Sequence, residues 1–237
     1  MKGKRQMKLD IKKEQQLIQT SETFLLSAIL AISGGFQDAY TYNVRNKVFS
    51  NAQTGNVVLM SQHFMCGQWL EGLRYLVPIL AFAIGVWVAE QIQGRFRYAK
   101  RLHWRQGILL LEIIILFVVG FMPTSLDMAA TALVSFACAM QVQTFRKVNG
   151  YSYASTMCIG NLRSGIAALS GYVREHKSSQ AEQMLYYFGI IFLFALGAGL
   201  GGVMSMHAAI GIRAIWVSCV LLLISFGLMF IDKPKIS

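Results

Sequence analysis

Eight apolar stretches, separated by short polar connections, constrain the fold of this chain more than any other feature. Hydrophobic residues make up 55% of its 237 residues and charged residues only 14%, which is too apolar for an ordinary soluble domain. A helix of about 20 apolar residues can cross a bilayer because its backbone polar groups are satisfied within the helix. The sequence therefore predicts an all-α, polytopic membrane protein in which residues 23–237 form one integral membrane domain.

Six of the apolar stretches have the length and composition of regular spans, and two do not. The stretch 54–66 is short and interrupted by Ser61, Gln62 and His63, and the stretch 154–173 contains Asn161 and Arg163. We expect these two to be re-entrant or broken helices and the other six to cross fully. The six expected crossings are residues 24–42, 75–89, 108–122, 128–145, 186–206 and 210–231.

The cations of this chain, which carries a net charge of +11, gather in certain connections. Many lie in the basic leader of residues 1–22, in the loop 95–105, and at Arg146 and Lys147. Cytoplasmic loops of membrane proteins are rich in Lys and Arg, and the six-crossing arrangement puts all three segments on that side with the N-terminus. The cations are not interleaved with aromatic residues along one face, so we expect no nucleic-acid partner.

Sequence motifs for catalysis or for metal binding are missing. The four cysteines are scattered without CxxC spacing, and the histidines have no metal-ligand spacing. No Ser-His-Asp set, phosphate loop or HExxH pattern occurs. We therefore expect no metal, no cofactor and no enzymatic activity.

The order of regular and irregular elements occurs twice, in residues 24–122 and 128–231. With three crossings in each half, the second half would be inverted relative to the first. A gapless overlay of residues 34–56 on 139–161 matches Asn56 with Asn161 and puts Asp38 over Gln143. Inverted repeats with interrupted helices in corresponding positions are typical of transporters that bind their substrate near the bilayer midplane.

Asp38 is the first candidate for a functional site, because it lies about 21 Å along its expected helix. A carboxylate facing lipid at the bilayer centre costs roughly 2.5 to 3.5 kcal/mol, so Asp38 should face the protein interior or a wet cavity. Asp38 is a proton or cation site, an anchor for a cationic substrate group, or a structural partner that pins two helices, and Arg163 is its candidate partner. Glu90 and Glu112 are expected nearer helix ends. The remaining candidates are Gln37, Asn51, Gln53, Thr54, Asn56, Gln143 and Asn161.

The runs SGGFQDAYTY and FSNAQTGNVV, with the later Gly160-Asn161 copy, resemble the YoaK family of small bacterial multi-pass membrane proteins. The resemblance covers nearly the whole chain. It implies a location in the bacterial cytoplasmic membrane, and it supplies no substrate, cofactor or catalytic residue.

Buried charge, broken helices and the repeat together favour a small secondary transporter or permease for a small solute, with proton coupling as one option. The alternative is a non-transporting scaffold or assembly factor whose polar cluster only fixes helix packing. An enzyme would have to build its site from Asp38, Arg163 and amides alone. The expected partners are the lipid bilayer and a small solute or proton, and a homo-oligomer stays open.

Overall fold

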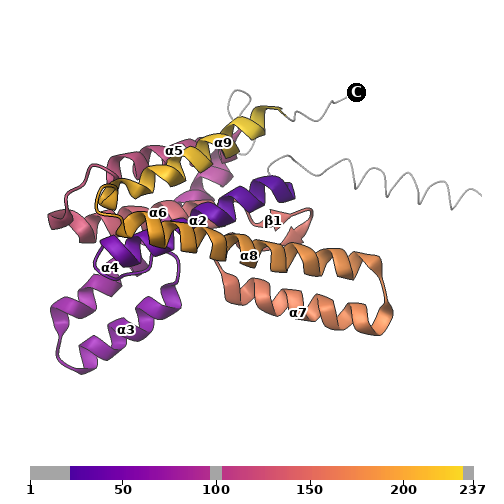
Figure 1. The fold of residues 1–237 in the computed structure, drawn as a ribbon, viewed down its shortest axis with the longest axis horizontal. Helices are drawn as coiled ribbons and strands as arrows, with labels where there is room; N and C mark the ends of the chain where they lie inside the picture. The colour runs from indigo at the N-terminus through magenta and orange to yellow at the C-terminus, as the bar shows by residue number, and fades with distance from the viewer. Residues whose placement is uncertain (1–21, 97–102, 232–237) are drawn as a thin grey trace, which may run out of the picture.

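The computed structural model describes residues 22–96 and 103–231. The basic leader up to residue 21, the cations between residues 97 and 102 and the tail from residue 232 lie outside the described residues. The described chain is helical apart from one short β-hairpin (Figure 1). Its elements are α2 (Phe24–Val44), α3 (Gln53–Met65), α4 (Trp69–Phe96), α5 (Trp104–Val119), η2 (Thr124–Leu126), α6 (Asp127–Thr144), β1 (Lys147–Val148), β2 (Tyr151–Ser152), α7 (Cys158–Glu175), α8 (Ser178–Met206), η3 (Gly211–Ile215) and α9 (Trp216–Ile231).

Among the described residues, four helical segments are long and apolar enough to cross a membrane, namely Trp69–Phe96, Thr124–Thr144, Ser178–Met206 and Gly211–Phe230. Helix α3, with 13 residues, reaches only about 20 Å and cannot cross a hydrocarbon core of about 30 Å. The expectation of a short helix at 54–66 is therefore confirmed. The total of six full crossings stays a prediction, because α2 and α5 are not among the four segments.

Two long helix pairs form the centre of the bundle, and glycines bring their backbones close together. Helix α8 packs along α2, where Gly197 faces the backbone of Ile32. Helix α6 packs along α4, where Gly85 faces the backbone of Phe136. A methyl group on either glycine would overlap the facing carbonyl oxygen. Small residues at such crossings are how membrane helices approach closely.

The remaining helices surround these pairs. The short helix α3 folds back on α4, and α7 folds back on α8, so the two hairpins project from the bundle in Figure 1. Helix α5 packs on α6, α9 packs on α2, and α5 and α9 contact each other. Their apolar side chains form the largest core cluster, which includes Leu30, Leu116, Val134 and Leu222.

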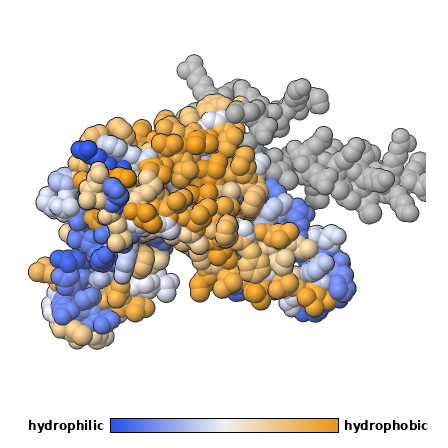
Figure 2. All heavy atoms as spheres, in the orientation of Figure 1, coloured by the Kyte–Doolittle hydropathy of each residue, from blue (hydrophilic) through white to orange (hydrophobic). Residues whose placement is uncertain are grey.

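The outer surface is apolar where a bilayer would contact it. Figure 2 shows hydrophobic residues over α8 and α9, whereas hydrophilic residues gather near the ends of the two projecting hairpins. Large apolar side chains such as Trp87, Phe192 and Val203 are 63%, 68% and 74% exposed. An apolar surface of this extent needs lipid or protein against it, so the arrangement is that of a membrane protein.

Candidate functional site

A polar cluster, which we name the Asp38 cluster, lies inside the bundle where the loop after α2 folds back onto that helix. Asp38 is 7% exposed, and its Oδ1 accepts hydrogen bonds from Ser50 Oγ at 3.1 Å and from the Asn51 backbone N–H at 2.7 Å. The Asn51 side chain donates to the Gly34 carbonyl at 3.3 Å. Asp38 thus faces the protein interior, and its partners come from a loop only 12 and 13 residues further along the chain.

A second part of the cluster joins three helices through Gln37. Its amide nitrogen donates to Ser33 Oγ at 3.0 Å and to Glu112 Oε1 on α5 at 3.4 Å. Its amide oxygen accepts from the Cys138 thiol of α6, with sulfur and oxygen 2.6 Å apart. Gln37 therefore connects α2 with α5 and α6.

The expectation that Glu112 lies near a helix end is wrong. Helix α5 begins at Trp104, four residues before the apolar run that the sequence suggested, so Glu112 lies in the middle of the helix. Its side chain is fully buried. The signal available in the sequence was an isolated carboxylate within an apolar run, which at membrane depth is itself a reason to expect an interior position.

The asparagines Asn56 and Asn161 hold their loops in the same way. Each side chain donates through Nδ2 to the carbonyl oxygen of the residue seven positions earlier, at 2.7 Å in both cases. Each also accepts at Oδ1 from the backbone N–H of that residue, Phe49 or Ala154, at 3.3 Å. The sequence overlay that paired Asn56 with Asn161 therefore pairs two identical local structures.

The loops that precede these asparagines also reverse direction in the same way. Asn46 and Lys47 follow α2 with φ of 61° and 59°, and Asn149 and Gly150 follow α6 with φ of 47° and 86°. Two successive residues with positive φ make a tight reversal, which Asn and Gly adopt readily. In the second loop the reversal joins β1 to β2, with Val148 opposite Tyr151.

Both loops reach α2 at Gly34, near the midpoint of that 21-residue helix. Asn51 binds the Gly34 carbonyl, and Thr156 of the other loop packs so closely that a methyl group at Gly34 would overlap its Cγ2. In the second loop, Ser155 Oγ accepts from Gln141 at 3.0 Å. The loops that lead into α3 and α7 therefore meet beside the Asp38 cluster.

Two of the expected site residues, Gln143 and Thr54, lie away from the Asp38 cluster. Gln143 is half-buried and donates to Glu90, and the residue of α6 that contacts the loop serine is Gln141. The gapless overlay missed this because Ser155 lies 14 residues after its partner, whereas Ser50 lies 12 after Asp38. Thr54 is exposed in the first turn of α3.

Arg163 is not the partner of Asp38. It is exposed on α7, two positions after the buried Asn161, and each helical residue turns by about 100°, so the two side chains point to different sides. Gln53 stays with the loop, donating to the Ser50 carbonyl at 2.8 Å and accepting from Asn56 at 3.0 Å.

Several polar atoms of the cluster have no hydrogen-bond partner among the described residues. They are buried side-chain oxygens, whereas buried polar groups in proteins are nearly always paired. Those nearest the two loops and Gln37 are Asn51 Oδ1, Gln141 Oε1, Thr156 Oγ1 and Glu112 Oε2. The cluster thus offers acceptor atoms that are not used within the described chain, and no group of three or more potential metal ligands occurs in the described ranges.

The bundle has two different ends, which we name the Arg45 end and the Glu22 end. At the Arg45 end, Arg45 is completely buried and its Nη1 lies 2.8 Å from Asp127 Oδ1. Its Nη2 donates to the Val119 carbonyl at 3.0 Å, and its Nε donates to the Tyr40 hydroxyl at 3.0 Å. Arg45 lies just after the expected crossing 24–42, and the sequence analysis did not include it among the candidate residues.

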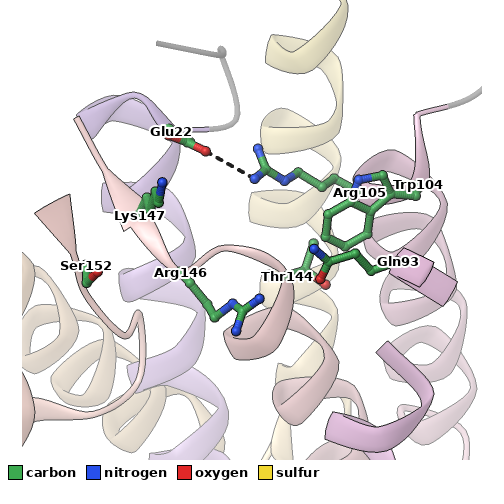
Figure 3. A pocket seen from close by; sticks show the side chains of 8 residues that line it. All are labelled: Glu22, Gln93, Trp104, Arg105, Thr144, Arg146, Lys147 and Ser152. Atoms are coloured by element: carbon green, nitrogen blue, oxygen red, sulfur yellow. Dashed lines mark hydrogen bonds and ion pairs between the residues drawn. The ribbon is translucent and has the colours of Figure 1, made fainter. Parts of the chain in front are cut away.

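At the Glu22 end, Glu22 Oε1 lies 3.1 Å from Arg105 Nη2, and both side chains are partly exposed. A pocket of about 460 Å³ opens beside this pair (Figure 3). Its lining comes from Glu22 just before α2, from α4, from the start of α5 and from residues 144–152. The lining contains neither Asp38 nor Gln37, and none of the residues that hydrogen-bond to either side chain.

Comparison with known proteins places the chain among membrane proteins. A family described as "Protein of unknown function (DUF1275)" matches residues 26–228. The chain is also similar to the UPF0700 transmembrane protein YoaK of Bacillus subtilis (strain 168), with 26% identity over 225 residues that cover 90% of this chain and 95% of that protein. No solved structure matches. With the match extending over most of its length, this transmembrane chain belongs to the DUF1275 family.

Proposed function

We propose that this protein is a small secondary transporter or permease, which moves a small solute through a polar site between two inverted halves. In this proposal the chain crosses the bacterial inner membrane six times. The N-terminus and the Glu22 end face the cytoplasm, and the Arg45 end faces the opposite side.

The packing supports an inverted repeat in which α2, α3, α4 and α5 correspond to α6, α7, α8 and α9. The contact of α2 with α8 then corresponds to that of α6 with α4, and the contact of α3 with α4 to that of α7 with α8. Gly197 in the first pair and Gly85 in the second have equivalent surroundings. The side chains of Asn56 and Asn161, which each bind the backbone of the residue seven positions earlier, also correspond in this pairing of helices.

One observation carries the functional proposal: two interrupted segments, one from each half, meet at Gly34 beside a buried carboxylate. Transporters with inverted repeats bind their substrates near the midplane, where broken helices offer backbone and side-chain groups that are not used in regular structure. Ionisable groups within membrane helices are mostly functional because their burial is unfavourable. The burial of Asp38 and its position beside the two loops support a binding site there.

The cluster suggests a role for each residue. Asp38 and Asn51 would bind the solute or a coupling proton, together with Gln37 and Glu112. Gln53, Asn56 and Asn161 would position the two loops, because their side chains are occupied by loop contacts. The buried Arg45–Asp127 pair would keep one end closed while the cluster communicates with the other. We propose no catalytic role for these groups.

A flux experiment tests the proposal. Purified protein would be screened for thermal stabilisation by amino acids, sugars, organic acids and monovalent cations, and each stabilising compound would be assayed for uptake into proteoliposomes with an imposed pH gradient. We expect Asp38→Asn to keep the fold, since Asn Oδ1 can still accept from Ser50 and Asn51, but to reduce uptake to the protein-free background. Glu71→Gln is the matched control, because it neutralises a carboxylate on α4 whose side chain is 42% exposed.

A companion pair of variants tests the two loops. Asn56→Ala and Asn161→Ala each leave a backbone N–H and C=O without the partner described above, which costs about 1 to 3 kcal/mol for each buried group left unsatisfied. If the halves are equivalent, both variants should reduce uptake and the free energy of unfolding by similar amounts. Unchanged uptake in Asp38→Asn would exclude the assigned site.

A second candidate, a non-transporting membrane scaffold, is favoured by the way Asp38 is held. Two donors from its own loop already bind one carboxylate oxygen, so the cluster could serve only to pin the loop to α2. This candidate predicts that no compound stabilises the protein or enters the proteoliposomes. It also predicts that Asp38→Asn lowers the yield of folded protein.

A further inference from the structure

The pocket at the Glu22 end is built from segments far apart in the sequence. Gln93 lies near the end of α4, Arg105 lies in the first turn of α5, and Thr144 is the last residue of α6. The hairpin after α6 adds Lys147 and Ser152. Its volume of about 460 Å³ falls within the range of small-molecule sites, roughly 300 to 1,000 Å³.

The charge of the lining is strongly positive. Arg105, Arg146 and Lys147 line the pocket with a single carboxylate, Glu22, which lies 3.1 Å from Arg105. Arg146 also reaches Glu90 at 3.5 Å, but both of those side chains are about half exposed, so the contact is weak. Lys147 has no ion-pair partner among the described residues. In Figure 3 these basic side chains approach the pocket from two sides.

A buried hydroxyl adds a second, independent observation. Thr144 lines the pocket, is only 2% exposed, and its Oγ1 has no hydrogen-bond partner in the described part of the chain. Leaving such a group unpaired is unfavourable, and a ligand in the pocket would pair it. The Gln93 amide and the Ser152 hydroxyl provide further neutral hydrogen-bonding groups in the same lining.

We propose that this pocket binds the phosphate group of an anionic molecule. Guanidinium groups form paired hydrogen bonds with phosphate oxygens, an ammonium group adds a point charge, and hydroxyl and amide groups can complete the contacts around a tetrahedral anion. The volume leaves room for the organic part of the ligand. The phosphate belongs either to a lipid headgroup, since basic pockets between membrane helices bind such groups, or to a soluble phosphorylated compound.

The site goes beyond the proposed transport function. It lies outside the Asp38 cluster, so phosphate binding stands or falls on its own measurement. A failure of the flux experiment leaves this proposal intact, and a failure of phosphate binding leaves the transport proposal intact.

The test uses the full chain, a double variant and a charge-matched control. Arg146→Gln/Lys147→Gln removes two pocket cations at exposed positions, and Arg174→Gln/Lys177→Gln removes two exposed cations at the α7–α8 turn. In one arm, delipidated protein is titrated with inorganic phosphate against sodium chloride of equal ionic strength, and its unfolding temperature is recorded. In the other, protein in phosphatidylcholine nanodiscs containing phosphatidylglycerol is released and its retained lipid is measured by native mass spectrometry.

A soluble ligand predicts that phosphate raises the unfolding temperature of the wild type and of the control but not of the pocket variant. A lipid ligand predicts that the wild type and the control retain phosphatidylglycerol and the pocket variant loses it. The proposal is overturned if the pocket variant behaves like the wild type in both arms, or if the wild type responds in neither. Should the double variant fold poorly, Thr144→Val keeps the shape of the buried side chain and should weaken the same response.

Discussion

The two ends of the bundle differ in how deeply they bury the ion pair formed by a carboxylate at the start of a helix. At the Arg45 end, Asp127 begins α6 and is bound by an arginine that no solvent reaches. At the Glu22 end, Glu22 precedes α2 and pairs with an arginine beside an open pocket. Both ends place a carboxylate at a helix N-terminus and pair it with a cation, but only one is sealed. Burial therefore distinguishes the two ends, because the Arg45 pair is closed to solvent whereas the Glu22 pair lies beside a pocket.

The largest expected effect comes from breaking the sealed pair. Asp127→Asn leaves the Arg45 cation buried without its counterion, which should reduce the free energy of unfolding by about 3 to 5 kcal/mol. Glu22→Gln breaks a partly exposed pair and should cost about 1 kcal/mol or less. Unfolding by added SDS in mixed micelles, followed by circular dichroism, measures both. Equal losses would mean that the two ends do not differ in the way described.

A smaller loss of stability tests whether the α2–α8 and α4–α6 pairs also differ from each other. Gly197→Ala and Gly85→Ala each push a methyl group onto a facing backbone carbonyl, and overpacking of this kind costs roughly 1 to 3 kcal/mol. We expect similar losses from the two variants in the same unfolding assay. Gly199→Ala is the control, because its methyl group would meet nothing within 4 Å. A loss confined to one pair would show that the halves pack differently.

The smallest effect concerns only the Glu22 end. His103 caps α5 by accepting a hydrogen bond at Nδ1 from the Arg105 backbone N–H, which requires that nitrogen to be unprotonated. Burial, and then the nearby Arg105 cation, lower the pKa of His103 below its usual 6.5. The unfolded chain therefore takes up this proton first as the pH falls. The stabilising contribution is complete above pH 6.5 and is lost as the pH falls through the lower folded pKa.

The replacement His103→Asn keeps a capping side chain and removes the titrating ring. We expect the difference in unfolding temperature between wild type and variant to depend on pH below about 6.5 and to be constant above it. A difference that stays constant from pH 8 to pH 5, a range chosen around that ordinary value, would argue against the role of His103.

The helices could be predicted because apolar length is a local property of the sequence. The expected stretch 54–66 became Gln53–Met65, and 186–206 became the end of the longer helix Ser178–Met206. The overlay matched Asn56 with Asn161 by position, and the structure adds that each side chain binds the backbone of the residue seven positions earlier.

Contacts between distant residues could not be predicted in this way. Glu112 meets Gln37 across 75 residues, and Asp127 meets Arg45 across 82. No local pattern states which face of α5 turns toward α2, and a gapless overlay cannot show that Gln141 rather than Gln143 contacts the second loop. The sequence therefore showed that Asp38 lies within an apolar helix, but the contacts that connect this region to α5 and α6 could be seen only in the folded structure.

The short span between Asp38 and its two donors has a consequence for how the chain enters a bilayer during synthesis. Asp38 can accept its hydrogen bonds from Ser50 and Asn51 as soon as those residues follow it out of the ribosome and the insertion machinery. Glu112 must wait for Gln37 to be brought against α5, and Arg45 must wait for the start of α6. Helix α2 and its loop can thus form their contacts before α6 is synthesised, whereas the Arg45 end can close only after the start of α6 is in place.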